Sequence, residues 1–149
     1  MAKSFAELWK KVDKNISAFK ANTPKEVGKV AQRNFTASFT NQGFDSKAWR
    51  EVQRRIPGTD AYKYPKSKGL GRRKKAILIG STGDLRRSVS QSLRSATWEK
   101  IKFQVSTPYA VYHNEGEGKI PKRQFIGSSR ELSNSILQIL NKNLAKCFK

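Results

Sequence analysis

The feature that most constrains the fold is an apolar stripe with helical spacing near the start of the chain. Six large apolar side chains recur at intervals of one, three and four residues: Phe5, Leu8, Trp9, Val12, Ile16 and Phe19. This spacing places them on one face of an amphipathic helix, with lysines on the other faces. We interpret the stripe as a core-packing face, the alternative being a basic helix that lies on a membrane surface.

A second helix is predicted to follow directly. Thr23-Pro24-Lys25-Glu26 combines an N-cap threonine, a proline at the first helical position and the glutamate of a capping box. The apolar stripe then continues to about Gln42, and Gly43 ends it. Residues 1–42 are therefore predicted to form a helical hairpin in which the second helix covers the first.

Residues 43–80 differ in composition from the segments on either side. Glycines and prolines interrupt them, tyrosines and Trp49 are interleaved, and they hold eleven basic against three acidic residues. The basic residues that we expect to face a partner or DNA are Arg54, Arg55, Arg72, Arg73, Lys74 and Lys75. Because a long stretch without regular structure is uncommon inside a compact domain, we predict an extended basic arm that becomes ordered against a partner.

The remaining residues predict a small sheet and a closing helix. Residues 88–94 are a weak strand candidate, and Ile101, Phe103 and Val105 alternate with polar residues as in a half-buried strand. These two strands are expected to form a hairpin that turns near residues 95–97. A short helix over 109–114, a third strand over 122–126 and a final helix capped by Ser128 or Ser129 complete the prediction. The fold class is α+β, in a single domain over residues 1–149.

Charge restricts the partners of the chain. Thirty-one Lys and Arg against eleven Asp and Glu give a net charge of +20. A field of this strength attracts nucleic acid, an acidic protein surface or an anionic membrane. No apolar run is long enough to span a bilayer and the first residues do not form a signal peptide, so we expect a cytoplasmic location. The lone Cys147 excludes an intramolecular disulfide and is interpreted as a small apolar residue of the last helix.

Residues for catalysis or metal binding are sparse. His113 is the single histidine, and only Glu115 and Glu117 lie near it in sequence. No nucleophile elbow, P-loop or EF-hand pattern occurs, and the glycine-rich stretches lack the lysine that a P-loop needs. We therefore expect no enzyme, no cofactor and no metal, and a structural hydrogen bond for His113.

The C-terminal part carries an ordered series of short motifs. The run Arg72–Lys75 precedes Ser81-Thr-Gly-Asp-Leu-Arg-Arg-Ser-Val89, and Thr107-Pro-Tyr-Ala-Val-Tyr-His-Asn-Glu-Gly116 and Ile120-Pro-Lys-Arg-Gln-Phe-Ile-Gly127 follow. In this order the series resembles the phage virion morphogenesis family, the tail-completion proteins of Mu-like and P2-like phages. It is also similar to neck and tail-completion proteins of other long-tailed phages. The resemblance covers roughly residues 44–147.

The resemblance implies a structural role in the virion. It implies assembly in the bacterial cytoplasm and a closed ring at the head–tail junction, expected to be six-fold, where the arm reaches a neighbouring subunit. The expected partners are further copies of the chain, connector or tail-tube proteins and, without sequence preference, packaged DNA, but no membrane. The residues expected to serve as scaffold or interface are Trp49, Gly83, Leu85, Tyr109, His113, Gly116, Pro121, Arg123 and Phe125.

Two other functions stay open at this point. A nucleic-acid-binding module would use the basic arm and its aromatic residues, and would bind free duplex with a steep salt dependence. A virion-borne nuclease or peptidoglycan hydrolase would need clustered acidic residues, whereas the eleven in this chain are scattered.

Overall fold

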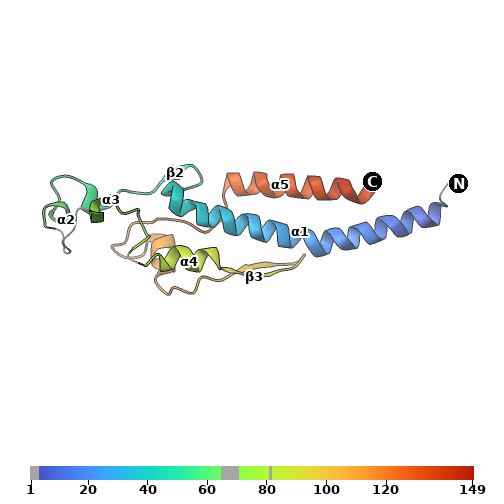
Figure 1. Ribbon diagram of the computed structural model, residues 1–149, viewed down its shortest axis with the longest axis horizontal. Helices are drawn as coiled ribbons and strands as arrows, with labels where there is room; N and C mark the ends of the chain where they lie inside the picture. The colour runs from blue at the N-terminus through green and yellow to red at the C-terminus, as the bar shows by residue number, and fades with distance from the viewer. Residues whose placement is uncertain (1–3, 65–70, 81) are drawn as a thin grey trace.

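One long helix organises the structure. The computed structural model describes residues 4–64, 71–80 and 82–149. Helix α1 (Phe5–Asn41) has 37 residues and is about 55 Å long at the usual rise per residue. Helix α5 (Arg130–Ala145) runs along it, and α4 (Asp84–Ser90) and strand β3 (Leu93–Ala96) also pack against it (Figure 1). The protein combines helices with small antiparallel sheets, which confirms the α+β class.

The predicted helical hairpin is wrong, because α1 continues through Pro24. Thr23 and Pro24 are both buried, and Thr23 does not adopt the extended conformation that an N-cap requires. Burial of the pyrrolidine ring offsets part of the cost of the hydrogen bond that proline removes from a helix. Figure 1 shows α1 changing direction part-way along its length. The capping box lies instead at the start of α1, where Ser4 and Glu7 exchange hydrogen bonds.

Two hairpins replace the single predicted sheet. Strand β1 (Gly43–Phe44) pairs with β2 (Lys47–Ala48), and β3 pairs with β4 (Ile101–Phe103), both antiparallel. The second hairpin is the predicted one, but it turns over residues 97–100, where the Thr97 and Lys100 backbones bond each other. The strand prediction for residues 88–90 is wrong. These residues end α4, where Leu85 and Val89 share a buried helical face.

The predicted third strand over 122–126 is also absent from the described residues. The backbone amide of Arg123 donates to the carbonyl oxygen of His113, and the amides of Phe125 and Ile126 donate to the side chain of Asn114. Without a neighbouring strand, this segment belongs to no sheet. The turn that holds it is the π-helical η2 (Tyr112–Gly116), which takes the place of the predicted short helix.

Residues 50–80 form short helical turns in the part that the structure describes. These are η1 (Gln53–Arg55), α2 (Asp60–Lys63) and α3 (Gly71–Lys74), grouped at the end of the molecule remote from both termini (Figure 1). Thr59 caps α2 by accepting a hydrogen bond from the Tyr62 amide. The prediction of an arm without regular structure is therefore wrong for these residues, because contacts within the arm already fold it.

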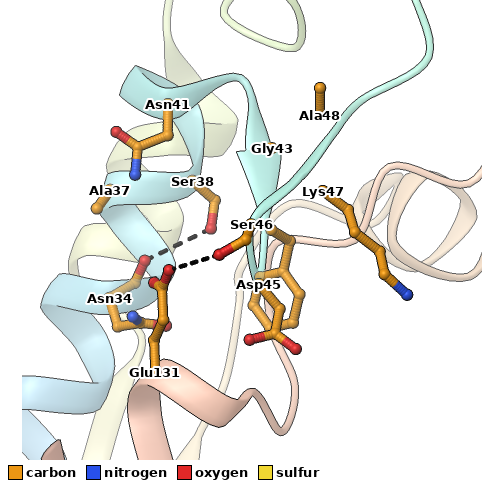
Figure 2. A pocket seen from close by; sticks show the side chains of 11 residues that line it. Asn34, Ala37, Ser38, Asn41, Gly43, Asp45, Ser46, Lys47, Ala48 and Glu131 are labelled. Carbon is orange, nitrogen blue, oxygen red and sulfur yellow. Dashed lines mark hydrogen bonds between the residues drawn. The ribbon is translucent and has the colours of Figure 1, made fainter.

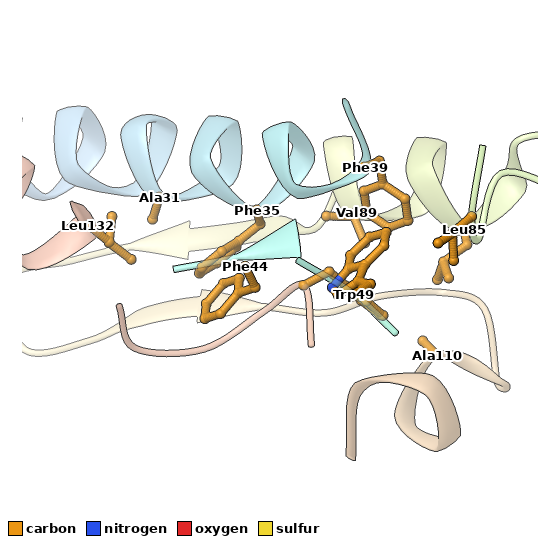
Figure 3. Close-up of a cluster of buried hydrophobic side chains, with 11 residues drawn as sticks. Ala31, Phe35, Phe39, Phe44, Trp49, Leu85, Val89, Ala110 and Leu132 are labelled. Carbon is orange, nitrogen blue, oxygen red and sulfur yellow. The ribbon is translucent and has the colours of Figure 1, made fainter. Parts of the chain in front are cut away.

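The core lies between the C-terminal half of α1 and the elements beside it. Phe39 has no exposed surface, and its ring meets those of Trp49 and Phe125 with centroids 5.6 and 5.3 Å away. Figure 3 shows the side chains that surround it. The cluster also contains Ala31, Phe35, Phe44, Ile77, Leu85, Val89, Ala110 and Leu132.

The C-terminal helix is as predicted. Ser129 caps α5 by accepting a hydrogen bond from the Leu132 amide at 3.1 Å. After α5, η3 (Lys146–Phe148) turns onto α1, where the Cys147 carbonyl accepts a hydrogen bond from the Asn15 side chain. Cys147 is buried, as predicted for a small apolar residue, but it lies in η3 rather than in the last α-helix.

Candidate partner-binding surfaces

Trp49 connects the start of the arm to the motif over residues 120–127. It follows β2, is buried, and its indole Nε1 donates to the carbonyl oxygen of Gln124 at 2.7 Å. Phe125, the next residue, is also buried and packs on Phe39. Both side chains are buried within the protomer, so the contacts of Trp49 and Phe125 are those of scaffold residues.

Arg123 occupies an interior position as well. It is 7% exposed, and its guanidinium donates twice to the carbonyl oxygen of Arg50, at 3.2 and 3.1 Å. Burial lowers the pKa of Arg123, and the nearby positive charges of Arg54 and Arg50 lower it further. Of the two roles expected for Arg123, scaffold or interface, these contacts describe a scaffold position, because its hydrogen bonds tie residues 120–127 to the start of the arm.

His113 lies half-buried beside this segment. Burial lowers its pKa, and the positive charge of Arg123 adds to the effect, so the imidazole is neutral at pH 7. Its Nδ1 is buried and has no hydrogen-bond partner among the described residues. The ring makes an edge contact with Tyr109, with centroids 6.2 Å apart. Among the described residues the predicted side-chain hydrogen bond is not seen at Nδ1, and the backbone carbonyl of His113 provides the connection to Arg123 instead.

Asn114 is the structural residue that the sequence analysis missed. Its Oδ1 accepts hydrogen bonds from the amides of Phe125 and Ile126, each at 3.0 Å. Gly116 closes the same turn with φ +78°, and a Cβ there would lie 2.7 Å from the Lys122 backbone. The signal in the sequence is the Asn-Glu-Gly spacing, since asparagine and glycine together favour turns held by side-chain to backbone bonds.

The other predicted scaffold residues separate into two groups. Gly83 precedes α4 with φ +70°, and Leu85 is buried, so Gly83 forms a turn and Leu85 anchors α4 in the core. Tyr109 is 44% exposed, so it is free to contact a partner. Pro121 is half-buried, and the strand predicted to begin after it does not form.

Arginines of the basic arm hold the arm together. The guanidinium of Arg54 donates to the carbonyl oxygen of Lys75 at 3.0 Å. That of Arg55 donates to the carbonyls of Arg73 and Lys75, at 2.9 and 2.6 Å, and forms an ion pair with Glu51. These contacts link η1 to the end of α3. Arg54 and Arg55, which were predicted to face a partner, therefore stabilise the structure of the arm itself.

The remaining arm cations divide in the same way. Arg73 donates to the carbonyl oxygen of Tyr62 and stacks on the Tyr62 ring, 3.9 Å from its centroid. Lys74 and Lys75 have exposed side chains. The side chain of Arg72 lies outside the described residues. Lys74 and Lys75 are thus the arm cations best placed to contact an anionic partner.

A polar hollow lies where the β1–β2 turn meets α1 and α5. It measures about 320 Å³ and is lined by Asn34, Ser38, Asp45, Ser46 and Glu131, among others (Figure 2). The Ser46 hydroxyl donates to Glu131 at 2.9 Å, and Asp45 accepts from the Arg130 amide. These hydrogen bonds connect the β1–β2 turn to the start of α5. The polar residues that line the hollow therefore stabilise the scaffold.

Across residues 4–64, 71–80 and 82–149, no group of three or more His, Cys, Asp or Glu side chains is arranged to hold a metal ion. In the same part of the chain, none of the helices has the length and apolar character needed to cross a bilayer. Comparison with protein families, with curated proteins and with solved structures found no match to this chain.

Proposed function

We propose that this chain is a structural virion protein of the neck or tail-completion type, which forms a closed ring at the head–tail junction of a phage. The observation that carries the proposal is the meeting of the motif segments around Trp49. Trp49 donates a hydrogen bond to the Gln124 carbonyl, and Arg123 donates to the Arg50 carbonyl. Leu85, which anchors α4, belongs to the same hydrophobic core as Trp49. Because the residues of the motif series stabilise one scaffold, the series suits a protein with a structural function.

The distribution of charge supports a role in assembly with anionic surfaces. The net charge of +20 weakens contact between copies, and an anionic surface offsets this repulsion. The arm, with the exposed Lys74 and Lys75, lies at the end of the molecule remote from both termini. We assign these lysines to contact with acidic connector subunits or with DNA in the channel.

Electron microscopy of the purified protein, and of particles from cells that express it with its neighbouring genes, tests the proposal. Rings, or density for this chain at the head–tail junction, are the expected result. Monomers that are absent from particles would contradict it.

Charge-neutral variants separate assembly from nucleic-acid binding. Lys74→Gln with Lys75→Gln removes two exposed charges and leaves the backbone carbonyl that binds Arg54 and Arg55. Lys10→Gln with Lys14→Gln is the matched control, because it removes the same charge from exposed positions of α1. The assembly role predicts that the arm variant alone loses incorporation into particles.

The second candidate function is a nucleic-acid-binding module, which the net charge favours. It predicts tight binding to free duplex, with the logarithm of affinity falling by about 0.9 per phosphate contact for each logarithm of salt concentration. In that case the arm variant would lower the affinity for duplex. It would also reduce the slope of log affinity against log salt by the contribution of at most about two phosphate contacts.

A further inference from the structure

The N-terminal half of α1 carries an apolar surface that no other described element covers fully. Phe5, Leu8 and Trp9 are 74%, 47% and 54% exposed. The rings of Phe5 and Trp9 meet edge to face with centroids 5.8 Å apart, so the two side chains support each other on the helix. Large, adjacent, exposed apolar groups of this kind mark interaction surfaces.

A shallow apolar groove lies further along the same helix. It measures about 290 Å³ and forms where the tip of the β3–β4 hairpin and α5 meet α1, lined chiefly by Pro24, Val27, Trp98, Ile101, Ile136 and Leu140. Phe19, the last residue of the stripe, contacts Trp98 with ring centroids 5.3 Å apart. Stripe and groove therefore form one continuous apolar track along α1.

The stripe cannot fill the groove of its own chain, because α1 is one continuous helix and both surfaces lie along it. A second molecule must provide the contact. We propose that two copies of this chain pair antiparallel through the N-terminal halves of α1, and that each places its stripe against the groove of the other. The contact is isologous, since the same track is used on both copies.

Charges beside the track support the antiparallel arrangement. Asp13 and Lys20 are both exposed, and neither forms an ion pair among the described residues. They lie seven residues apart on one edge of the stripe, a separation of about 10 Å that is too long for an ion pair within the helix. An antiparallel copy sets Asp13 against the partner's Lys20, and the reverse, so that two ion pairs form.

This register also aligns the apolar groups. It places the two-fold axis between residues 16 and 17 and brings Trp9 opposite the partner's Pro24, which lines the groove. Phe5, Leu8 and Trp9 together expose about 300 Å² of side-chain surface. A specific interface buries about 800 Å² on each partner. A two-fold pair buries both the stripe and the groove of each copy, which brings the buried area on each copy toward this value.

Asp13 at the edge of the stripe favours a second copy over an anionic membrane surface. Lys10 and Lys14 point away from the stripe, whereas Lys11 and Lys20 lie beside it and suit either kind of surface. An anionic membrane would repel Asp13, whereas a second copy pairs it with the partner's Lys20. The pairing is also independent of the proposed function, because it concerns the protein in solution whatever its later role.

Charge reversal tests the pairing through sedimentation equilibrium and native mass spectrometry of the full chain. We expect a concentration-dependent dimer. Asp13→Lys alone or Lys20→Asp alone raises the dissociation constant at least about tenfold, and the double variant restores it because the charges have exchanged places. A monomer at all concentrations, or a folded double variant weaker than both single variants, overturns the proposal.

A disulfide measures the register directly. In a Cys147→Ala background, Ile16→Cys lies beside the two-fold axis and is expected to form a cross-linked dimer on mild oxidation. Lys14→Cys, on the opposite face, is the matched control and is expected to stay monomeric. Equal cross-linking of the two variants overturns the proposal. So does a monomer that binds phosphatidylserine vesicles and loses this binding on Trp9→Ala, which would assign the stripe to membranes.

Discussion

Residues 5–22 and 23–41 of α1 both place large apolar side chains at helical spacing, yet their surroundings differ. In the second half Phe39 is fully enclosed and Phe35 packs edge-on against Phe103 of β4. In the first half Phe5 and Trp9 are mostly exposed. Helical periodicity thus shows which face is apolar, but not whether the same chain covers that face.

The largest expected effect comes from truncating one phenylalanine in each half. Phe39→Ala leaves a cavity between Trp49 and Phe125 and is expected to lower the free energy of unfolding by about 3–5 kcal/mol. Phe5→Ala removes an exposed ring and is expected to change it by less than about 0.5 kcal/mol at a dilution where the protein is monomeric. Urea unfolding measures both. Equal losses would contradict the difference between the two halves.

A polar side chain of the scaffold is expected to rank next. Asn114→Ala leaves the amides of Phe125 and Ile126 without an acceptor, and we expect a loss of about 2 kcal/mol in the free energy of unfolding. Asn134→Ala, at an exposed position of α5, is the matched control and is expected to be nearly neutral. An Asn114 variant as stable as this control would show that solvent replaces the two bonds.

Pro24 marks the boundary between the two halves. Pro24→Ala restores a backbone donor inside α1 but removes a buried ring. Together the two effects are expected to raise the free energy of unfolding by about 1 kcal/mol. Amides around residue 24 are then expected to exchange more slowly with solvent, as measured by NMR. Faster exchange would mean that the buried ring contributes more to α1 than the missing hydrogen bond costs.

The smallest effect concerns His113. Because its pKa is lowered in the folded state, the unfolded chain takes up a proton near its ordinary pKa of about 6.5 that the folded chain does not. The free energy of unfolding should therefore be constant above that pH and fall as the pH decreases through it. Urea midpoints at several pH values measure the slope, and His113→Gln should reduce it. An unchanged slope in the variant would assign the pH dependence to other groups.

Sequence reasoning succeeded where one local pattern decides the outcome. Ser129 and the stripe after it predicted α5, and alternation predicted β4. These features depend on a few neighbouring residues, which local propensity and capping describe well.

Sequence reasoning failed where distant contacts decide. Thr23-Pro24 has the composition of a helix start, but burial keeps it inside α1. Residues 122–126 resemble a strand, but Asn114 occupies the amides that a neighbouring strand would bind. In the arm, the clustered arginines suggested an outward-facing surface, whereas Arg54, Arg55 and Arg73 bind backbone carbonyls of the arm itself.

Residue-resolved hydrogen exchange along α1, at low and high protein concentration, tests the central difference most directly. The structure predicts that amides of residues 27–41 exchange at a rate set by global unfolding at both concentrations. Amides of residues 8–20 should exchange faster at low concentration and become protected as the copies pair. Equal, concentration-independent protection of both halves would contradict the account, because the stripe would then be covered within a single chain.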